Sequence, residues 1–348
     1  MMSVEVKPQK PWQMTPREMV YPTFLIVISV IATFITVAIS PMKGKLAYAF
    51  LFFIFSTVSM FFYKYRIRGK QAAIDSLASS IALTGALIVF APVVSILVTT
   101  VIKGAPGLHW SLFSETMFSA SYMDPVKQGG LLHAIVGTVY LILLSIIISV
   151  PMGILTALYL TEIKGPGSKF IQFTVQAMSG VPSVVAGLFI FAAIILASPL
   201  KASGIDGAFA LSILMVPTVT RTAQEVLLLV PNDLREAGLA MGATQWRTVA
   251  SIVVPAARNG LLTATILGVA RIAGETAPLI FTIGGSDKLN LNPFHDYQGA
   301  LPFYVWKGLL LGTPESIQRA WTGILVLLIL VLTLFTLARR FGSRKVGA

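Results

Sequence analysis

Long apolar runs separated by short polar segments make up most of this chain. Each of eight runs is long enough to cross the roughly 30 Å apolar core of a bilayer as a helix of about 20 residues. The runs cover residues 21–40, 46–63, 81–102, 131–160, 169–198, 207–230, 259–284 and 321–338. The pattern therefore predicts an all-α, polytopic membrane protein with eight transmembrane helices.

Two runs, 131–160 and 169–198, exceed one bilayer thickness, so we expect tilted or broken helices there. Pro151 and Pro182 are the predicted break points, because proline lacks the amide hydrogen that a helix interior needs. The first two runs are joined by so few residues that they can only form a helical hairpin. We therefore expect two parts. They are residues 1–70, a cytoplasmic N-terminal segment followed by an accessory transmembrane hairpin, and residues 75–345, a six-helix core.

The composition agrees with a membrane protein. Hydrophobic residues make up 55% of the chain and charged residues 11%, whereas soluble domains carry about 25% charged residues. The net charge of +12 does not indicate nucleic-acid binding, because the basic residues lie at the ends of the apolar runs rather than in one patch. The lack of cysteine excludes disulfides and thiolate metal sites. The histidines, His109, His133 and His295, are too scattered to predict a metal site or a catalytic triad.

The basic residues also predict the orientation. With both termini in the cytoplasm, the cytoplasmic segments hold about twice as many Lys and Arg residues as the external segments. This orientation places residues 232–255 in the cytoplasm and residues 103–130 and 285–318 outside. Aromatic side chains in 103–130, such as Trp110 and Phe113, predict a short helix at the membrane surface. Either external segment could bind an extracytoplasmic partner or only pack at the interface.

Residues 232–255 form a polar stretch with the pattern of a short docking helix. Asp233 is the predicted N-cap, and Glu236, three residues later, is placed to complete a capping box. Gly242 can end the helix and turn the chain. Three apolar residues fall at helical spacing and form one stripe: Leu234, Ala237 and Met241.

Two arginine–glutamate pairs lie inside apolar runs, where a charge costs about 2.5–3.5 kcal/mol at the bilayer centre. Arg271 and Glu275 are four residues apart, as are Arg221 and Glu225, so each pair would share a helix face. One interpretation is a mutual salt bridge that lowers the insertion cost. The other is a polar path for an anion, because arginine supplies a planar set of donors suited to phosphate. Two residues beside the first pair would let the helix open at mid-membrane: Gly274 and Pro278.

The docking stretch resembles the cytoplasmic EAA loop of permeases in ATP-binding-cassette (ABC) importers. The similar positions are Glu236, Ala237, Gly238, Gly242, Ile252 and Pro255. The family usually has Ala at the position of Gly238, and glycine weakens a helix by about 1 kcal/mol relative to alanine. The resemblance implies a coupling helix seated in a groove of a separate ATPase subunit. Its coupling residues would be Asp233, Glu236, Ala237, Gly238 and Gly242.

Further blocks, within residues 100–340, are similar to the PstA family of phosphate permeases. They are Gly129-Gly130, Ala134 to Thr138, Val181 to Leu188, Pro217 with Arg221-Thr222 and Glu225, Val230-Pro231 leading into Leu234 to Ala237, and Ala270 to Leu279. His133 stands where the family pattern predicts Asn. The resemblance implies a type I ABC importer permease core of six helices, here preceded by the extra hairpin. It also implies a translocation path at Arg271, Glu275, Arg221 and Glu225.

The same resemblance implies a four-part importer of the bacterial inner membrane. Its other parts would be a PstC-like permease, two PstB-like ATP-binding subunits and an extracytoplasmic PstS-like phosphate-binding protein, with membrane lipid around the permeases. The chain has no Gly-x-x-x-x-Gly-Lys-Ser/Thr loop, so we expect a transport subunit rather than an enzyme, with no cofactor.

Other functions remain open on the sequence. A permease for phosphonate, sulfate or molybdate would have the same core, because substrate choice rests mostly with the binding protein. A secondary transporter working without ATP would need matched inverted repeats, which the sequence lacks. An intramembrane enzyme would need a nucleophile, a base or metal ligands, and no such group is evident.

Overall fold

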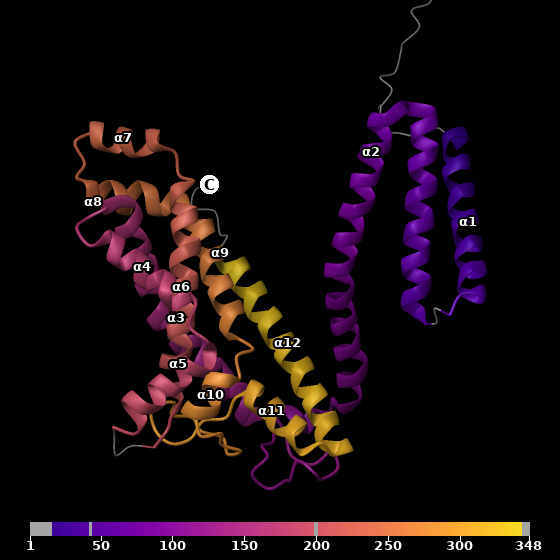
Figure 1. Cartoon of the computed structure of the whole chain (residues 1–348). Coiled ribbons are helices and arrows are strands. Elements are labelled where there is room, and N and C mark those ends of the chain that lie inside the picture. The colour runs from indigo at the N-terminus through magenta and orange to yellow at the C-terminus, as the bar shows by residue number, and fades with distance from the viewer. Residues whose placement is uncertain (1–15, 42–43, 198–200, 343–348) are drawn as a thin grey trace, which may run out of the picture. The chain divides into compact units, whose positions relative to one another are not determined.

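Helices form the regular structure of the computed structural model, which describes residues 16–41, 44–197 and 201–342 (Figure 1). Within these ranges no strand forms, and Gly284 pairs with Gln298 in an isolated bridge. The predicted all-α class is confirmed. The chain divides into two compact units, Met1–Ile96 and Leu97–Ala348, and the division predicted near residues 70–75 stays a prediction. The N-terminal segment up to residue 15 and the basic C-terminus beyond residue 342, both expected in the cytoplasm, lie outside the described residues.

The first unit contains a helical hairpin. Helix α1 (Pro16–Ile39) lies beside the first part of α2 (Lys45–Gly104) (Figure 1). Across the hairpin the hydroxyl oxygens of Ser29 and Ser59 are 3.2 Å apart, and the rings of Phe34 and Tyr48 have centroids 5.2 Å apart. The predicted pairing of the first two apolar runs is confirmed.

Helix α2 is longer than one membrane span. Its 60 residues would extend about 90 Å at 1.5 Å per residue, whereas the apolar core of a bilayer is ~30 Å thick. The helix is broken at Gly69, which has φ 83° and ψ −178°, a conformation that is essentially restricted to glycine. The break falls in the basic stretch between the second and third predicted spans, so each part of α2 contains one of them.

The second unit is a bundle of helices (Figure 1). The chain enters it through the end of α2 and two short 3₁₀ turns, η1 (Ala105–Gly107) and η2 (Trp110–Phe113). Of the short helix predicted within 103–130, only these two 3₁₀ turns form, and its position at the membrane surface stays a prediction. The bundle consists of α3 (Leu132–Leu158) with the π-helical turn η3 (Tyr159–Ile163), α4 (Ser168–Ser179), α5 (Ser183–Ile190) with η4 (Phe191–Ile195), α6 (Gly204–Leu228), α7 (Asn232–Ala240), α8 (Gln245–Thr248), η5 (Val249–Val253), α9 (Val254–Ile272), α10 (Ala277–Thr282), α11 (Leu301–Leu311) and α12 (Pro314–Gly342).

Five helices of the described chain are long and apolar enough to cross a membrane, or up to seven if each bent pair is one span. One bent pair, α4 and α5, changes direction by 104°, and the other, α6 and α7, by 73°. The chain is thus a multi-pass membrane protein. The count of eight crossings stays a prediction, because it requires α2 to cross twice.

The two prolines expected to break helices behave differently. Pro182 is the N-cap of α5 and lies at the 104° bend, so the predicted break there is confirmed. Pro151 lies inside α3, which continues past it, so that predicted break is wrong. Membrane helices tolerate proline where neighbouring elements support the backbone. Helix α6 packs against α3 two residues beyond Pro151, where a Cβ on Gly153 would lie 2.8 Å from the Val219 side chain.

The run at 259–284 is not one helix. The helical stretch begins earlier, at Gln245, and continues through η5 and α9 to Ile272. The hydrophobic pattern does not include this beginning, because its first residues, such as Gln245 and Arg247, are polar. The stretch then stops at Ile272, and α10 is a separate short helix. The predicted boundaries of this span are therefore corrected at both ends.

Glycines let the central helices of the second unit approach closely. Val219 of α6 lies between Gly153 of α3 and Gly268 of α9, and a Cβ on Gly268 would lie 2.6 Å from the Val219 side chain. Close backbone contact of this kind is the main source of helix association in lipid, where burying apolar side chains gains little. Leu141, Leu211, Met215, Ile272 and Leu279 complete this central core.

Candidate functional site

The break between α9 and α10 contains the first predicted site. Four residues separate the last residue of α9, Ile272, from the first residue of α10, Ala277. The amide of Glu275 donates to the carbonyl of Ile272 at 3.1 Å. A Cβ on Gly274 would meet nothing within 4 Å, and Pro278 lies in the first turn of α10. The helix opening predicted from this glycine and proline is confirmed.

The structure brings Arg271 and Glu275 together. They form an ion pair across the end of α9, between guanidinium Nη1 and carboxylate Oε1. The position of Arg271 in the last turn of α9 is also favourable for a cation, because the C-terminal end of a helix carries partial negative charge. The Arg271 side chain is 45% exposed and that of Glu275 is 16% exposed. One edge of the guanidinium is therefore paired, and the other donors remain accessible.

Two of the sequence blocks that carry the family resemblance meet at this break. A Cβ on Gly187 of α5 would lie 2.6 Å from the Cα of Pro278, so only glycine permits this approach of α5 and α10. Leu279 is buried at the same contact, in the central core. The break beside Arg271 is thus supported by a tightly packed neighbour.

The second predicted pair is not a salt bridge. Arg221 and Glu225 both lie in α6, and both side chains are exposed. No ion pair within 4.0 Å joins them in the described structure. The mutual salt bridge expected from their spacing is therefore wrong. Because exposed charges on an apolar helix are costly in lipid, these two side chains require water or a partner protein at this surface.

The packing of α6 on α9 sets the distance between the two arginines along the bundle. Gly268 lies against Val219, and Gly260 lies against Val226, so the helices are antiparallel. Arg221 is two residues from Val219 toward one end of the bundle, and Arg271 is three residues from Gly268 toward the other. At 1.5 Å per residue, the two arginines are separated by roughly 7–8 Å along the bundle.

The predicted docking helix exists as α7, with a different start. It begins at Asn232, after Pro231, and Asp233 lies in its first turn rather than at the N-cap. Neither Asp233 nor Glu236 makes a capping bond, so the predicted capping box is wrong. Proline before the first turn provides the extended backbone that starts the helix, with φ −58° and ψ 140°. Asp233, Glu236 and Ala237 are all exposed.

The end of α7 follows the prediction. Gly242 has φ +81°, and its amide donates to the carbonyl of Leu239 at 2.9 Å. The amide of Ala243 donates to the carbonyl of Gly238 at 3.3 Å. These two bonds are the Schellman pattern, in which a left-handed glycine ends a helix. Gly238 is buried, and a Cβ there would lie 2.8 Å from the side chains of both Thr248 and Ile252. Glycine at this position therefore fits the tight contact between α7 and the following helix.

The apolar stripe of α7 faces outward. Leu234 is exposed, as is Met241 just beyond the helix, and Leu239 and Trp246 add to the same exposed apolar set. Large apolar side chains exposed on a short segment between polar residues are typical of a protein–protein contact. The predicted docking role stays a prediction, and the exposure of these side chains is compatible with it.

Two charged residues that the sequence did not single out connect α7 to the bundle. Arg235 of α7 donates from Nε to Glu162 Oε2 at 2.9 Å and from Nη2 to Glu162 Oε1 at 2.8 Å. Glu162, in η3, is 5% exposed. A sequence signal existed, because Glu162 is an acidic residue in a short segment whose other charges, Lys164 and Lys169, are basic.

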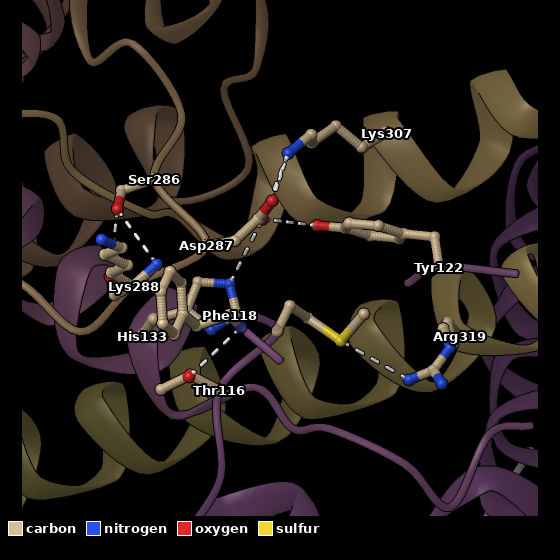
Figure 2. Close-up of polar contacts among 10 residues, drawn as sticks. Thr116, Phe118, Tyr122, His133, Ser286, Asp287, Lys288, Lys307 and Arg319 are labelled. Carbon is tan, nitrogen blue, oxygen red and sulfur yellow. Dashed lines mark hydrogen bonds and ion pairs between the residues drawn. The ribbon is translucent and has the colours of Figure 1, made fainter. Parts of the chain in front are cut away.

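At the opposite end of the bundle, the Asp287 carboxylate contacts three side chains, as Figure 2 shows. Its carboxylate accepts from Lys307 Nζ at 2.9 and 3.1 Å and from the Tyr122 hydroxyl at 3.2 Å. His133 Nε2 lies 3.9 Å away. Burial raises the pKa of Tyr122, and the nearby Asp287 charge raises it further. The two segments expected outside the membrane, 103–130 and 285–318, are therefore bound to each other here.

Arg319 of α12 binds the 103–130 loop at the same end of the bundle. It is 2% exposed, and its Nη2 donates to the carbonyls of Asp124, Pro125 and Gln128 at 3.1, 2.8 and 2.8 Å. No carboxylate pairs with it in the described residues. No pattern in the sequence indicates that Arg319 is buried.

Comparison with known proteins identifies the family. Residues 149–346 match the model of the binding-protein-dependent transport system inner membrane component family. The chain belongs to this family. The match contains α7, α9 and both arginine–glutamate pairs, and the resemblance inferred from their sequence blocks is confirmed.

Relatives of this chain include several phosphate transport system permease proteins named PstA. The phosphate transport system permease protein PstA of Haemophilus influenzae is 37% identical over 262 residues, which are 72% of this chain and 87% of the relative. PstA of Mycobacterium leprae is 34% identical over 280 residues, 78% of this chain and 90% of the relative. PstA 1 of Mycobacterium tuberculosis H37Rv is 39% identical over 207 residues, 59% of this chain and 67% of the relative.

Among solved structures, the chain is similar to an inward-facing conformation of the MetNI methionine ABC transporter. The TM-score is 0.48 at 17% sequence identity, and the match covers 61% of this chain and 93% of the other.

Proposed function

We propose that the chain is the transmembrane permease subunit of an ATP-driven importer for inorganic phosphate. The observation that carries the proposal is its 37% identity with the Haemophilus influenzae phosphate permease across 87% of that relative. The partners would be a second, PstC-like permease, two PstB-like ATPase subunits and an extracytoplasmic PstS-like phosphate-binding protein. Both termini would be cytoplasmic.

The proposed coupling element is α7 with the glycine turn that follows it. Its exposed acidic residues, Asp233 and Glu236, and its exposed apolar residues would bind a groove of an ATPase subunit. When ATP closes the two ATPase subunits, α7 would move with them and change the packing of α6 and α9 behind it. Ala237, Gly238 and Gly242 would shape this contact.

The proposed translocation path runs along the charged surface of α6 and α9. Arg271 would bind the phosphate through the guanidinium donors that its ion pair leaves accessible. Glu275 would keep that binding weak, since a permease must release its substrate. Arg221 and Glu225, roughly 7–8 Å further along the bundle, would form the next polar step. The path would be completed by the second permease.

The test is transport by the complete four-part complex in proteoliposomes. We expect uptake of labelled phosphate that requires ATP and the binding protein, with little competition from sulfate, molybdate or phosphonate. Uptake of one of those anions in place of phosphate would show that the substrate is another oxyanion. Uptake by the purified chain alone, without ATP, would refute the proposal and indicate a secondary transporter.

Two variants test the assigned residues in the same assay. Glu236→Lys should abolish ATP-driven uptake while the protein stays in the membrane, and Glu115→Lys, a charge reversal at an exposed loop residue, is its control. Arg271→Gln should reduce phosphate flux in an assembled complex, with Arg258→Gln on the same helix as control. Failed assembly of Arg271→Gln would show that the ion pair has a structural role, and normal flux in an assembled complex would show that Arg271 does not bind the phosphate.

A further inference from the structure

Glu162 and Arg235 together connect three elements at the α7 end of the bundle. The guanidinium of Arg235 uses all three of its nitrogens. Besides the two bonds to the Glu162 carboxylate, Nη1 donates to the carbonyl of Val230 at 2.7 Å, and Nη2 donates to the carbonyl of Leu227 at 2.9 Å. The Asn232 side-chain oxygen accepts a further bond from Nη1 at 3.1 Å.

The bonds from Arg235 to the carbonyls of Leu227 and Val230 lie at the C-terminal end of α6. The last four carbonyls of a helix have no partner within the helix, and Leu227 is in the last turn of α6, with Val230 just past its end. A guanidinium satisfies these acceptors and suits the negative end of the helix. Arg235 therefore fixes the 73° bend between α6 and α7.

Glu162 extends the connection to α3 and to α8. It lies in the π-helical turn η3, which ends at Lys164 in a left-handed conformation, φ +50°. The Glu162 backbone carbonyl also accepts from the side-chain amide of Gln245 at 2.6 Å. Glu162, just after the end of α3, thus binds two helices of the 232–255 segment: α7 through Arg235 and α8 through Gln245.

We propose that the Glu162–Arg235 pair is the joint through which movement of α7 reaches α3 and α6. Glu162 and Arg235 are positioning residues, and this role rests on the proposed function. Without the pair, α7 would be attached mainly by the short connections at residues 229–231 and 241–244 and by its contact with Ile252 and Thr248. It could then follow an ATPase subunit without moving the bundle. Loss of the joint would uncouple ATP hydrolysis from transport.

The test compares transport and ATP hydrolysis in one preparation of the complete complex. We expect Arg235→Gln and Glu162→Gln to assemble and to hydrolyse ATP, with phosphate uptake per ATP lowered about tenfold, within the range of measured coupling effects. The exchanged pair Glu162→Arg with Arg235→Glu should recover part of the loss, because it restores the ion pair but not the carbonyl bonds. The control is Lys201→Gln with Asp296→Asn, which removes an exposed ion pair elsewhere and should leave uptake per ATP unchanged.

A second measurement does not depend on the transported substrate. Hydrogen exchange of the amides in Asn232–Ala240, measured on the full-length permease in detergent, should accelerate about tenfold in Arg235→Gln because the local opening free energy falls. The exchange result stands even if phosphate proves to be the wrong cargo. Unchanged uptake per ATP would overturn the proposal, as would unchanged exchange. Equal loss of uptake, hydrolysis and assembly would also overturn it and leave only a structural role.

Discussion

The two ends of the second unit (Figure 1) are both held by charged groups, but they differ in how many charged residues take part. At the α7 end, Glu162 and Arg235 form one two-bond ion pair, and large apolar side chains remain on the surface. At the α11 end, Asp287 binds a lysine and a tyrosine, and the buried Arg319 binds three carbonyls of the preceding loop. The α7 end is anchored through one charged pair and the bonds of its two members, and the α11 end through three charged residues, Asp287, Lys307 and Arg319.

This difference separates two physical roles. An element that must bind a partner and move needs few anchors and an exposed apolar surface, since low local stability and motion go together. A loop region that must keep its shape needs its buried polar groups satisfied within the protein. The α7 end is closer to the first case, and the α11 end is closer to the second because Asp287 and Arg319 bind several groups of its loops. The following predictions test this contrast through stability.

The largest effect is expected at Arg319. Arg319→Met keeps an apolar side chain of similar length but leaves the carbonyls of Asp124, Pro125 and Gln128 without their donor. A buried carbonyl left without its donor costs about 1–3 kcal/mol, so thermal unfolding of the purified protein in detergent should occur at a clearly lower temperature. Arg258→Met, at an exposed position of α9, should change stability by less than about 0.5 kcal/mol. Equal unfolding temperatures for the two variants would contradict the anchoring role of Arg319.

A smaller effect is expected at Asp287. Asp287→Asn removes the charge that Lys307 faces and weakens the acceptor of the Tyr122 hydroxyl. Both charged side chains are about one-third exposed, so solvent screening reduces the loss to about 2 kcal/mol or less. Limited proteolysis should then cut the 103–130 loop faster than in the wild type. Asp296→Asn is the control, because its lysine partner is largely exposed. Cleavage at the wild-type rate would show that Asp287 does not close this end.

The alkaline limit of stability tests the same end through Tyr122. Its pKa is raised by burial and by Asp287, whereas an unfolded tyrosine has a pKa of about 10. Because the folded-state pKa is raised, the contribution of the neutral Tyr122 hydroxyl to stability is fully present below about pH 10. It is lost as pH rises through the folded-state value. Tyr122→Phe should cost about 1 kcal/mol at neutral pH for the lost hydrogen bond and should weaken the decline above pH 10. A decline identical to that of the wild type would exclude Tyr122 as its source.

Local chemistry explains what the sequence predicted well. The helix hairpin, the break at Pro182, the opening at Gly274 and the turn at Gly242 depend on residues close to one another in the chain. Prolines also show the limit of local prediction, since Pro151 lies inside a continuous helix and Gly153, two residues later, packs against α6. The start of the helix at Gln245 was missed because its first residues are polar.

Charged pairs show more clearly that local spacing alone does not determine which residues make contact. The spacing of four residues predicted Arg271 with Glu275, which do pair, and Arg221 with Glu225, which do not. The spacing rule describes neighbours on a helix surface, but it does not state which other groups compete for them. The pairs that hold the two ends, Arg235 with Glu162 and Lys307 with Asp287, join positions 73 and 20 residues apart. No local pattern specifies such partners, because the fold alone brings them together.

The smallest effect on stability is expected at Met241, and it sharpens the contrast most directly. Its side chain is 79% exposed, so Met241→Ser should change the stability of the isolated permease by less than about 0.5 kcal/mol. If α7 is the surface that an ATPase subunit covers, the same change removes apolar area from that contact and should reduce the amount of ATPase that co-purifies. Leu310→Ser is the control, at an apolar residue exposed to a similar extent on α11 at the other end. If less ATPase co-purifies with Met241→Ser alone, the α7 end is the one that binds the ATPase. An equal reduction in both variants would show that the two ends do not differ in ATPase binding.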